Sequence, residues 1–192
     1  MRLDPATIAR LICRFVPIDY VRVTPLTFRA TPLGMGYGET RFASPGRSFA
    51  LIYAAENLAT GIAETILRDR YEGVSAREVM LTEILAWGAT RVAATRPLRM
   101  LDLRGNGCFL LGVSTDINGA KAQDEARAFS QDVYDQTDLD GILYHSRLLK
   151  TNCAAVYDRA VGANLTATPV VDLVTLAGLV PALKSLDVAL IK

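Results

Sequence analysis

Residues 28–65 read FRATPLGMGYGETRFASPGRSFALIYAAENLATGIAET, and this stretch contains the strongest structural signals in the chain. It begins inside a segment rich in glycine and proline, residues 25–48, which predicts a long irregular loop. The apolar run Phe49–Ala54 follows and predicts a buried strand. Asn57 is a suitable N-cap for a helix predicted over Leu58–Tyr71, whose apolar residues recur at helical spacing. The stretch therefore predicts a loop, a strand and a helix in direct succession.

Short elements of both kinds surround this stretch. Before it, apolar spacing predicts a helix over Ala6–Phe15, and Val21–Val23 is a candidate strand. After it, a largely polar helix is predicted over Gly119–Asp135. Further strands are expected at 79–85, 91–94, 98–103, 141–144 and 153–157, and the chain closes with a short helix and a strand at 188–191. Because the strands and helices follow no strict βαβ rhythm, we expect an α+β fold.

The composition is typical of one globular domain in a reducing compartment. The chain has 192 residues, of which 51% are hydrophobic and 21% charged, so it can bury a core and disorder is not expected. The formal net charge of +1 provides no basic excess for nucleic-acid binding. Three well-separated cysteines do not suggest a disulfide framework, and no signal segment or membrane-spanning apolar run is evident. We therefore expect a cytoplasmic protein with no direct nucleic-acid or membrane partner.

Sequence motifs for metal and nucleotide sites are missing. The single histidine, His145, excludes an H-E-x-x-H zinc site and any site built from several histidines. Neither a P-loop nor a G-x-G-x-x-G sequence occurs. Asp135, Asp138 and Asp140 do not follow the order of a calcium-binding loop, and we interpret them as part of a solvated loop. The sequence therefore predicts no metal site.

The predicted loop, strand and helix collect side chains suited to binding and cleaving a dinucleotide. Arg29 and Arg41 can hold pyrophosphate oxygens through their planar, permanently charged guanidinium groups. Tyr37 and Tyr53 can stack on a flat ring or hydrogen-bond through the hydroxyl. Glu64 can hold sugar hydroxyls and stabilise positive charge on a glycosyl carbon. These are the groups needed to cleave an N-glycosidic bond in a dinucleotide.

The order of these residues resembles the pattern of the RES-domain family. That pattern has an early arginine, a second arginine before an aromatic residue, a glycine, a strand ending in tyrosine, a glutamate on a helix, and a late serine motif. The matching pieces here are Phe28-Arg29, Gly38–Phe42, Gly46, Leu51–Ala55, Ala63–Thr65, Pro97–Leu103 and Asp140–Arg147. Many members have tryptophan where this chain has Phe42. The resemblance covers most of the chain.

The resemblance implies a fold, a substrate and a set of site residues. The implied fold is that of bacterial ADP-ribosyltransferase toxins, a single domain of small central sheets flanked by helices. The implied substrate is NAD, consumed without a metal by hydrolysis, by phosphorolysis or by transfer of ADP-ribose to a protein. The family's arginine falls on Arg29 or Arg41, its glutamate on Glu64 and its serine on Ser146. The expected catalytic residues are therefore Glu64, Arg41 and Ser146, and the expected NAD-binding residues are Arg29, Tyr53 and Tyr37.

The same resemblance implies a domain organisation and a partner. Residues 1–24 are expected to form an N-terminal leader with a helix, and residues 25–165 the RES domain. Residues 166–192 are expected to form a C-terminal extension packed on that domain. Members of the family are usually toxins neutralised by an antitoxin with a helix-turn-helix DNA-binding domain, so we expect such a partner here.

Several of these residues also have an ordinary structural interpretation. Glu64 lies nearly opposite the apolar stripe of its predicted helix and has Arg68 four residues on, as in an exposed ion pair. Tyr53 is also suited to a core position with a satisfied hydroxyl, and Ser146 to capping a turn. His145 is expected to point away from Ser146 because neighbouring side chains alternate along a strand. The alternative to an enzyme is a module of the same fold that binds a nucleotide or a protein without catalysis.

Overall fold

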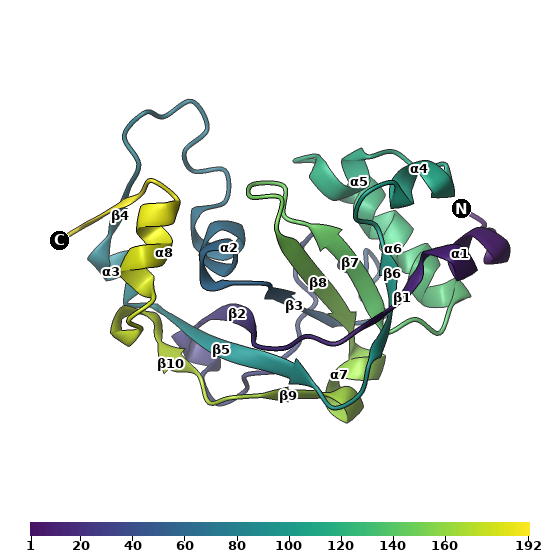
Figure 1. The fold of residues 1–192 in the computed structure, drawn as a ribbon, viewed down its shortest axis with the longest axis horizontal. Coiled ribbons are helices and arrows are strands. Elements are labelled where there is room, and N and C mark those ends of the chain that lie inside the picture. Colours follow the sequence, from purple (N-terminus) through teal and green to yellow (C-terminus); the bar gives the residue numbers. More distant parts are fainter.

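A nine-stranded mixed sheet runs through the computed structural model, which describes residues 1–192. The strand order is β1-β6-β7-β8-β3-β2-β5-β10, with β9 also paired to β5 (Figure 1). All pairs in this sheet are antiparallel except β6–β7. The strands are β1 (Ile12–Phe15), β2 (Tyr20–Pro25), β3 (Leu51–Ala55), β5 (Trp87–Ala94), β6 (Leu98–Asp102), β7 (Gly141–His145), β8 (Asn152–Tyr157), β9 (Leu165–Ala167) and β10 (Val171–Asp172). A separate parallel pair joins β4 (Glu78–Met80) to β11 (Ala189–Ile191).

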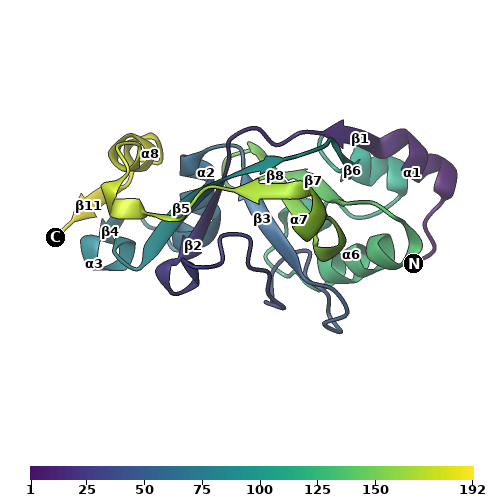
Figure 2. The ribbon, with the colours of Figure 1, turned by 90° about the horizontal axis from the view of Figure 1, so that it is seen from below.

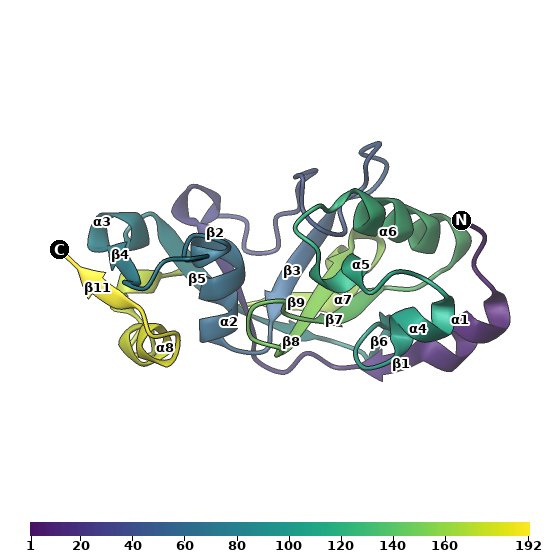
Figure 3. The same cartoon turned by 90° about the horizontal axis from the view of Figure 1, so that it is seen from above.

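Short helices cover the sheet at both ends of the molecule. Figures 1 and 3 show α1, α4, α5 and α6 at the end that holds the N-terminus, and α3 and α8 at the end that holds the C-terminus. No helix has the length and apolar character needed to cross a membrane. The helices are α1 (Pro5–Leu11), α2 (Leu58–Ile62), α3 (Leu81–Ile84), α4 (Gly107–Leu111), α5 (Asp116–Gly119), α6 (Asp124–Gln136), α7 (Asp158–Asn164) and α8 (Leu179–Ser185), with 3-10 turns η1 (Leu26–Phe28) and η3 (Leu173–Thr175) and a π-helical segment η2 (Ala63–Leu67).

The main sheet splits between β2 and β3. Strand β2 pairs with β5 along its whole length, but it meets β3 only at Val21 opposite Ala55. Beyond this pair the two strands separate. One apolar cluster, which includes Val23 and Ile62, packs β2 and β5 against α2 and α8. The other strands pack into two further clusters, one of which also includes Tyr20 of β2 and Val92 of β5. Figure 2 shows an elongated molecule with α8 at one end and α6 toward the other. The split therefore leaves an opening in the middle of the sheet.

Helix α2 packs over this opening and then changes its geometry. The Asn57 side chain caps the helix by accepting from the Thr60 amide at 2.9 Å. Gly61 lets the helix lie close to the sheet, because a Cβ at this position would stand 2.9 Å from Cγ2 of Val23. The helix continues as the π-helical segment η2, which ends where the Arg68 amide donates to Ala63 O at 2.7 Å. Arg68 has φ 47°, a backbone conformation that is strained for a residue with a side chain.

The structure confirms the α+β class and corrects several element boundaries. Residues 12–15 of the predicted first helix form strand β1, because they pair with β6 at the edge of the sheet. Residues 81–84, expected as strand, form the short helix α3. The helix that begins at Leu58 ends at Leu67 rather than Tyr71, because the π-turn and the positive φ of Arg68 stop it. Helices α4 and α7 were not predicted from the sequence.

Candidate active site

A cleft of about 760 Å³ lies where β2 and β3 separate. Its walls come from β2, β3, the α2–η2 helix, the glycine-rich loop of residues 28–41 and the turn between β7 and β8. Volumes of roughly 300–1,000 Å³ are usual for small-molecule sites. The cleft is therefore large enough for a nucleotide-sized ligand.

Cationic side chains outnumber carboxylates in the cleft wall. Of its two carboxylates, Asp69 forms an ion pair with Arg147, whereas Glu64 has no cationic partner. Outside the wall, Glu72 pairs with Lys121. The cations that line the cleft are Arg22, Arg41, Arg68, Lys121 and Arg147. The first three of these have no carboxylate partner, so the cleft retains positive charge for an anionic ligand.

A buried serine holds the carboxylate of Glu64. Ser146 is 1% exposed, and its Oγ donates to Oε1 of Glu64 at 2.5 Å. Ser146 Oγ also accepts from the backbone amides of Leu148 and Leu149 at 3.2 and 3.1 Å. These two bonds orient the hydroxyl so that its proton is directed to Glu64. Ser146 does not line the cleft, so it stands behind Glu64 and fixes the direction of the carboxylate.

The π-helical turn places Glu64 in the cleft wall. The structure contains no ion pair between Glu64 and Arg68, so the surface pair that their spacing suggests is not formed. Both side chains line the cleft instead. Single π-turns inside helices are frequent at functional sites, and strained backbone collects there as well. The local geometry of residues 63–68 thus favours a functional position for Glu64.

Tyr53 on β3 and Arg41 on the glycine-rich loop both line the cleft and are linked through that loop. The Tyr53 hydroxyl donates to Oγ1 of Thr40 at 2.9 Å and accepts from the Phe42 amide at 3.0 Å. Burial raises the pKa of Tyr53 to about 12, so the hydroxyl stays protonated and keeps donating at neutral pH. Between these two anchors, Arg41 lines the cleft and donates to Ile117 O at 3.2 Å. Desolvation lowers the pKa of Arg41 from its ordinary value, but the guanidinium remains charged.

The structure adds Arg22, a site residue that the sequence analysis did not single out. Arg22 lies on β2 and lines the cleft, where one guanidinium nitrogen donates to Gly34 O at 2.7 Å. Its Nε is buried without a hydrogen-bond partner, and burial lowers the pKa of the group. A buried donor without a partner is costly unless something binds it. The available signal was a single charge inside the apolar strand segment Val21–Val23.

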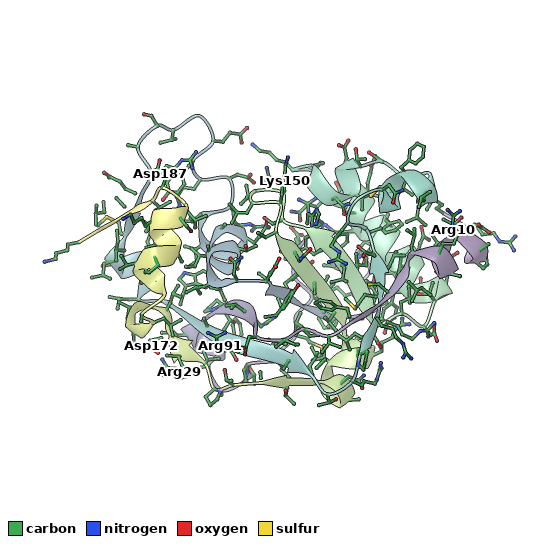
Figure 4. The ribbon with its side chains drawn as sticks, viewed as in Figure 1. Arg10, Arg29, Arg91, Lys150, Asp172 and Asp187 are labelled. Carbon is green, nitrogen blue, oxygen red and sulfur yellow. The ribbon has the colours of Figure 1, made fainter.

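The structure separates Arg29 and Tyr37 from the other expected site residues. Arg29 follows η1 and pairs with Asp172, outside the residues that line the cleft (Figure 4). Tyr37 is 56% exposed on the glycine-rich loop and does not line the cleft. Strand β7 places His145 on the exposed side, whereas its neighbour Ser146 is buried, as alternation predicts.

Removal of the Ser146 hydroxyl is expected to reduce turnover more than substrate affinity. If Glu64 acts on a bound substrate, Ser146→Ala should lower kcat by about 10- to 100-fold, because an unrestrained carboxylate spends less time in the productive direction. KM should change little, because Ser146 does not line the cleft. Steady-state kinetics would measure the two effects separately. Ser114→Ala is a matched control, because Ser114 also accepts from a backbone amide but lies outside the cleft. An equal loss in both variants would contradict a positioning role.

The described residues bring no group of three or more His, Cys, Asp or Glu side chains together to hold a metal ion.

Comparisons with known proteins connect this geometry to a family. Residues 14–175 match the family described as RES domain. Among solved structures, the chain is similar to one in the crystal structure of the M. tuberculosis MbcT–MbcA toxin–antitoxin complex. The TM-score is 0.65 and the identity 17%, over 88% of this chain and 92% of that one. At this identity the similarity establishes a shared fold. No curated protein matches the chain.

Proposed function

This chain belongs to the RES domain family, and from that membership we propose that it is a toxin-type enzyme that cleaves the nicotinamide N-glycosidic bond of NAD. The observation that carries the proposal is the Glu64 carboxylate, held at 2.5 Å by buried Ser146 in a cleft that also contains unpaired arginines. A fixed carboxylate beside cationic groups suits a substrate in which a pyrophosphate is close to a glycosidic bond.

Some side chains of the cleft bind the substrate, and others act on the bond that breaks. Arg22 and Arg41 bind the pyrophosphate, because neither has a carboxylate of its own to neutralise it. Glu64 holds the nicotinamide ribose and stabilises positive charge at its C1′ as the C1′–N bond breaks. Nicotinamide leaves with the electron pair of that bond. An acceptor oxygen or side chain then bonds to C1′, and an acceptor that carries a proton on the bonding atom releases it to solvent. Tyr53 supports the site by holding the loop that carries Arg41.

Incubation of the purified protein with NAD tests the proposal directly. Products are resolved by mass spectrometry in buffers with and without inorganic phosphate. Free nicotinamide is expected, and its co-product identifies the acceptor: ADP-ribose for water, a phosphorylated ADP-ribose for phosphate, or an ADP-ribosylated protein. Absence of nicotinamide, with NAD binding retained and no modified protein in an added cell extract, would favour the alternative of a binding module without catalysis.

An antitoxin partner completes the proposal. The support is the shared fold with a structure solved as part of a toxin–antitoxin complex. We expect this antitoxin to carry a helix-turn-helix DNA-binding domain, as is usual for partners of the family. Expression of the chain alone should arrest growth and deplete cellular NAD, and co-expression of an antitoxin that binds the chain should restore both. Growth arrest that persists with constant NAD would contradict the proposed link between toxicity and NAD cleavage.

A further inference from the structure

The end of the cleft formed by β5 and η1 is aromatic. Trp87, the first residue of β5, and Phe28, the last residue of η1, both line the cleft. The pairing of Trp87 with Pro25 and the bond from the Leu26 amide to Ala86 O at 2.9 Å hold these two segments together. Phe28 is 56% exposed, although a phenylalanine side chain is usually buried.

Neither of these rings packs against another aromatic ring of the protein. Five aromatic pairs occur in the structure, and none includes Trp87 or Phe28. Trp87 is only half-buried, because one side packs on the apolar cluster of β2, β5, α2 and α8 while the rest borders the cleft. The cleft wall therefore includes a half-buried indole and an exposed phenyl ring, neither of which is stacked on another aromatic ring of the protein.

The strand order places a cation between this aromatic end and the catalytic end. Tyr53 lies on β3, Arg22 on β2 and Trp87 on β5, and these three strands are neighbours in the order β3-β2-β5. Since Pro25 is opposite Trp87, Arg22 and Trp87 are three positions apart along the paired strands, or about 10 Å. Their side chains therefore leave opposite faces of the strand pair, and both reach the cleft where β2 separates from β3. The sequence of groups across the cleft is aromatic, cationic, aromatic, and a dinucleotide has the matching sequence of base, pyrophosphate, base.

We infer that Trp87 and Phe28 form the subsite for the adenine ring of NAD, and that this subsite determines the specificity for a dinucleotide with a purine base. The inference rests on the proposed function, because it assigns the second half of the same substrate. It also fixes the direction of binding: the nicotinamide ribose lies at Glu64, and the adenine lies at the β5 end of the cleft. Stacking of a purine on the indole requires no hydrogen-bond partner, and both rings line the cleft that the dinucleotide would enter.

The chain contains a single tryptophan, so its emission reports on this subsite alone. The probe is AMP, the adenine half of NAD, titrated into the wild-type protein. AMP is expected to change the Trp87 emission in a saturable way. Trp87→Leu should raise the Kd of AMP, measured by calorimetry, by roughly 10-fold, as loss of one base–aromatic stack would. Phe28→Ala should weaken binding in the same direction, and because Phe28 is exposed this variant should fold normally.

Phe109→Ala is the matched control, because Phe109 is 80% exposed on α4 and outside the cleft. Its affinity for AMP should equal that of the wild type. If NAD is cleaved but AMP leaves the Trp87 emission unchanged, the subsite assignment is overturned while the proposed function stands. An unchanged Kd in both Trp87→Leu and Phe28→Ala overturns it equally. If NAD is neither bound nor cleaved, the proposed function fails and the assignment fails with it.

Discussion

Replacing Glu64 by glutamine is expected to lower kcat for NAD cleavage by about 10³-fold, because a neutral amide cannot stabilise positive charge developing at C1′. The glutamine side chain has nearly the same shape, and its carbonyl oxygen can still accept from Ser146 Oγ. The loss should therefore appear in turnover while the protein stays folded and continues to bind NAD. Nicotinamide release measures turnover, and calorimetry with NAD measures binding.

A second glutamate provides the control for this prediction. Glu125 is exposed in the first turn of α6 and outside the cleft, so Glu125→Gln should leave turnover unchanged. Circular dichroism of both variants would exclude a difference in folding. Turnover of Glu64→Gln within a few-fold of the wild type would remove Glu64 from the proposed reaction.

Arg41→Ala is expected to reduce kcat/KM for NAD by about 10²-fold, through the loss of charge-assisted hydrogen bonds to the pyrophosphate. Arg41 lines the cleft without a carboxylate partner, so its charge is available to a ligand. Arg41→Lys should recover only part of the loss, because an ammonium group keeps the charge but not the planar fork of donors. NAD cleavage at several substrate concentrations would give kcat/KM for each variant.

The sequence did not decide whether Arg29 or Arg41 is the arginine of the family pattern, and a variant of Arg29 allows the two to be compared. Arg29 pairs with Asp172 outside the cleft, so Arg29→Ala should lose far less activity than Arg41→Ala (Figure 4). Arg10→Ala, on exposed α1, gives the baseline for removing a surface arginine. A greater loss in Arg29→Ala than in Arg41→Ala would assign the pyrophosphate to Arg29 and require the loop to rearrange on binding.

The local order of elements was predictable because each depends on short-range physics. Gly and Pro spacing predicted the irregular loop, the run Phe49–Ala54 predicted β3, and Asn57 predicted the start of α2. The π-turn after Ile62 was not predictable, because it depends on how the helix packs over the split sheet rather than on residue propensity. Residues 12–15 formed a strand for a similar reason: the free edge of β6 outweighed the helical spacing of their apolar residues.

The same division applies to the candidate site. The sequence pointed to Glu64, Arg41, Tyr53 and Ser146, and the structure brings these residues together around the cleft. It could not show that Ser146 stands behind Glu64, because their bond joins segments 82 residues apart. Arg22 was missed because an arginine in a short strand is usually an exposed side chain, and only the split of the sheet turns it into a cleft.

The glycine-rich loop has an entropic consequence that follows from how it is anchored. Tyr53 fixes its residues 40 and 42, the Arg22 side chain binds Gly34 O, and Gly36 bridges to Leu51. Ordering a backbone costs about 1–2 kcal/mol per residue, and these anchors place that cost in folding rather than in ligand capture. Because the loop is already ordered, little of the free energy of ligand binding is lost in ordering it. The affinity of the cleft therefore depends mainly on the contacts between the ligand and the cleft. Cutting an anchor far from the ligand would thus weaken binding without removing any contact to it.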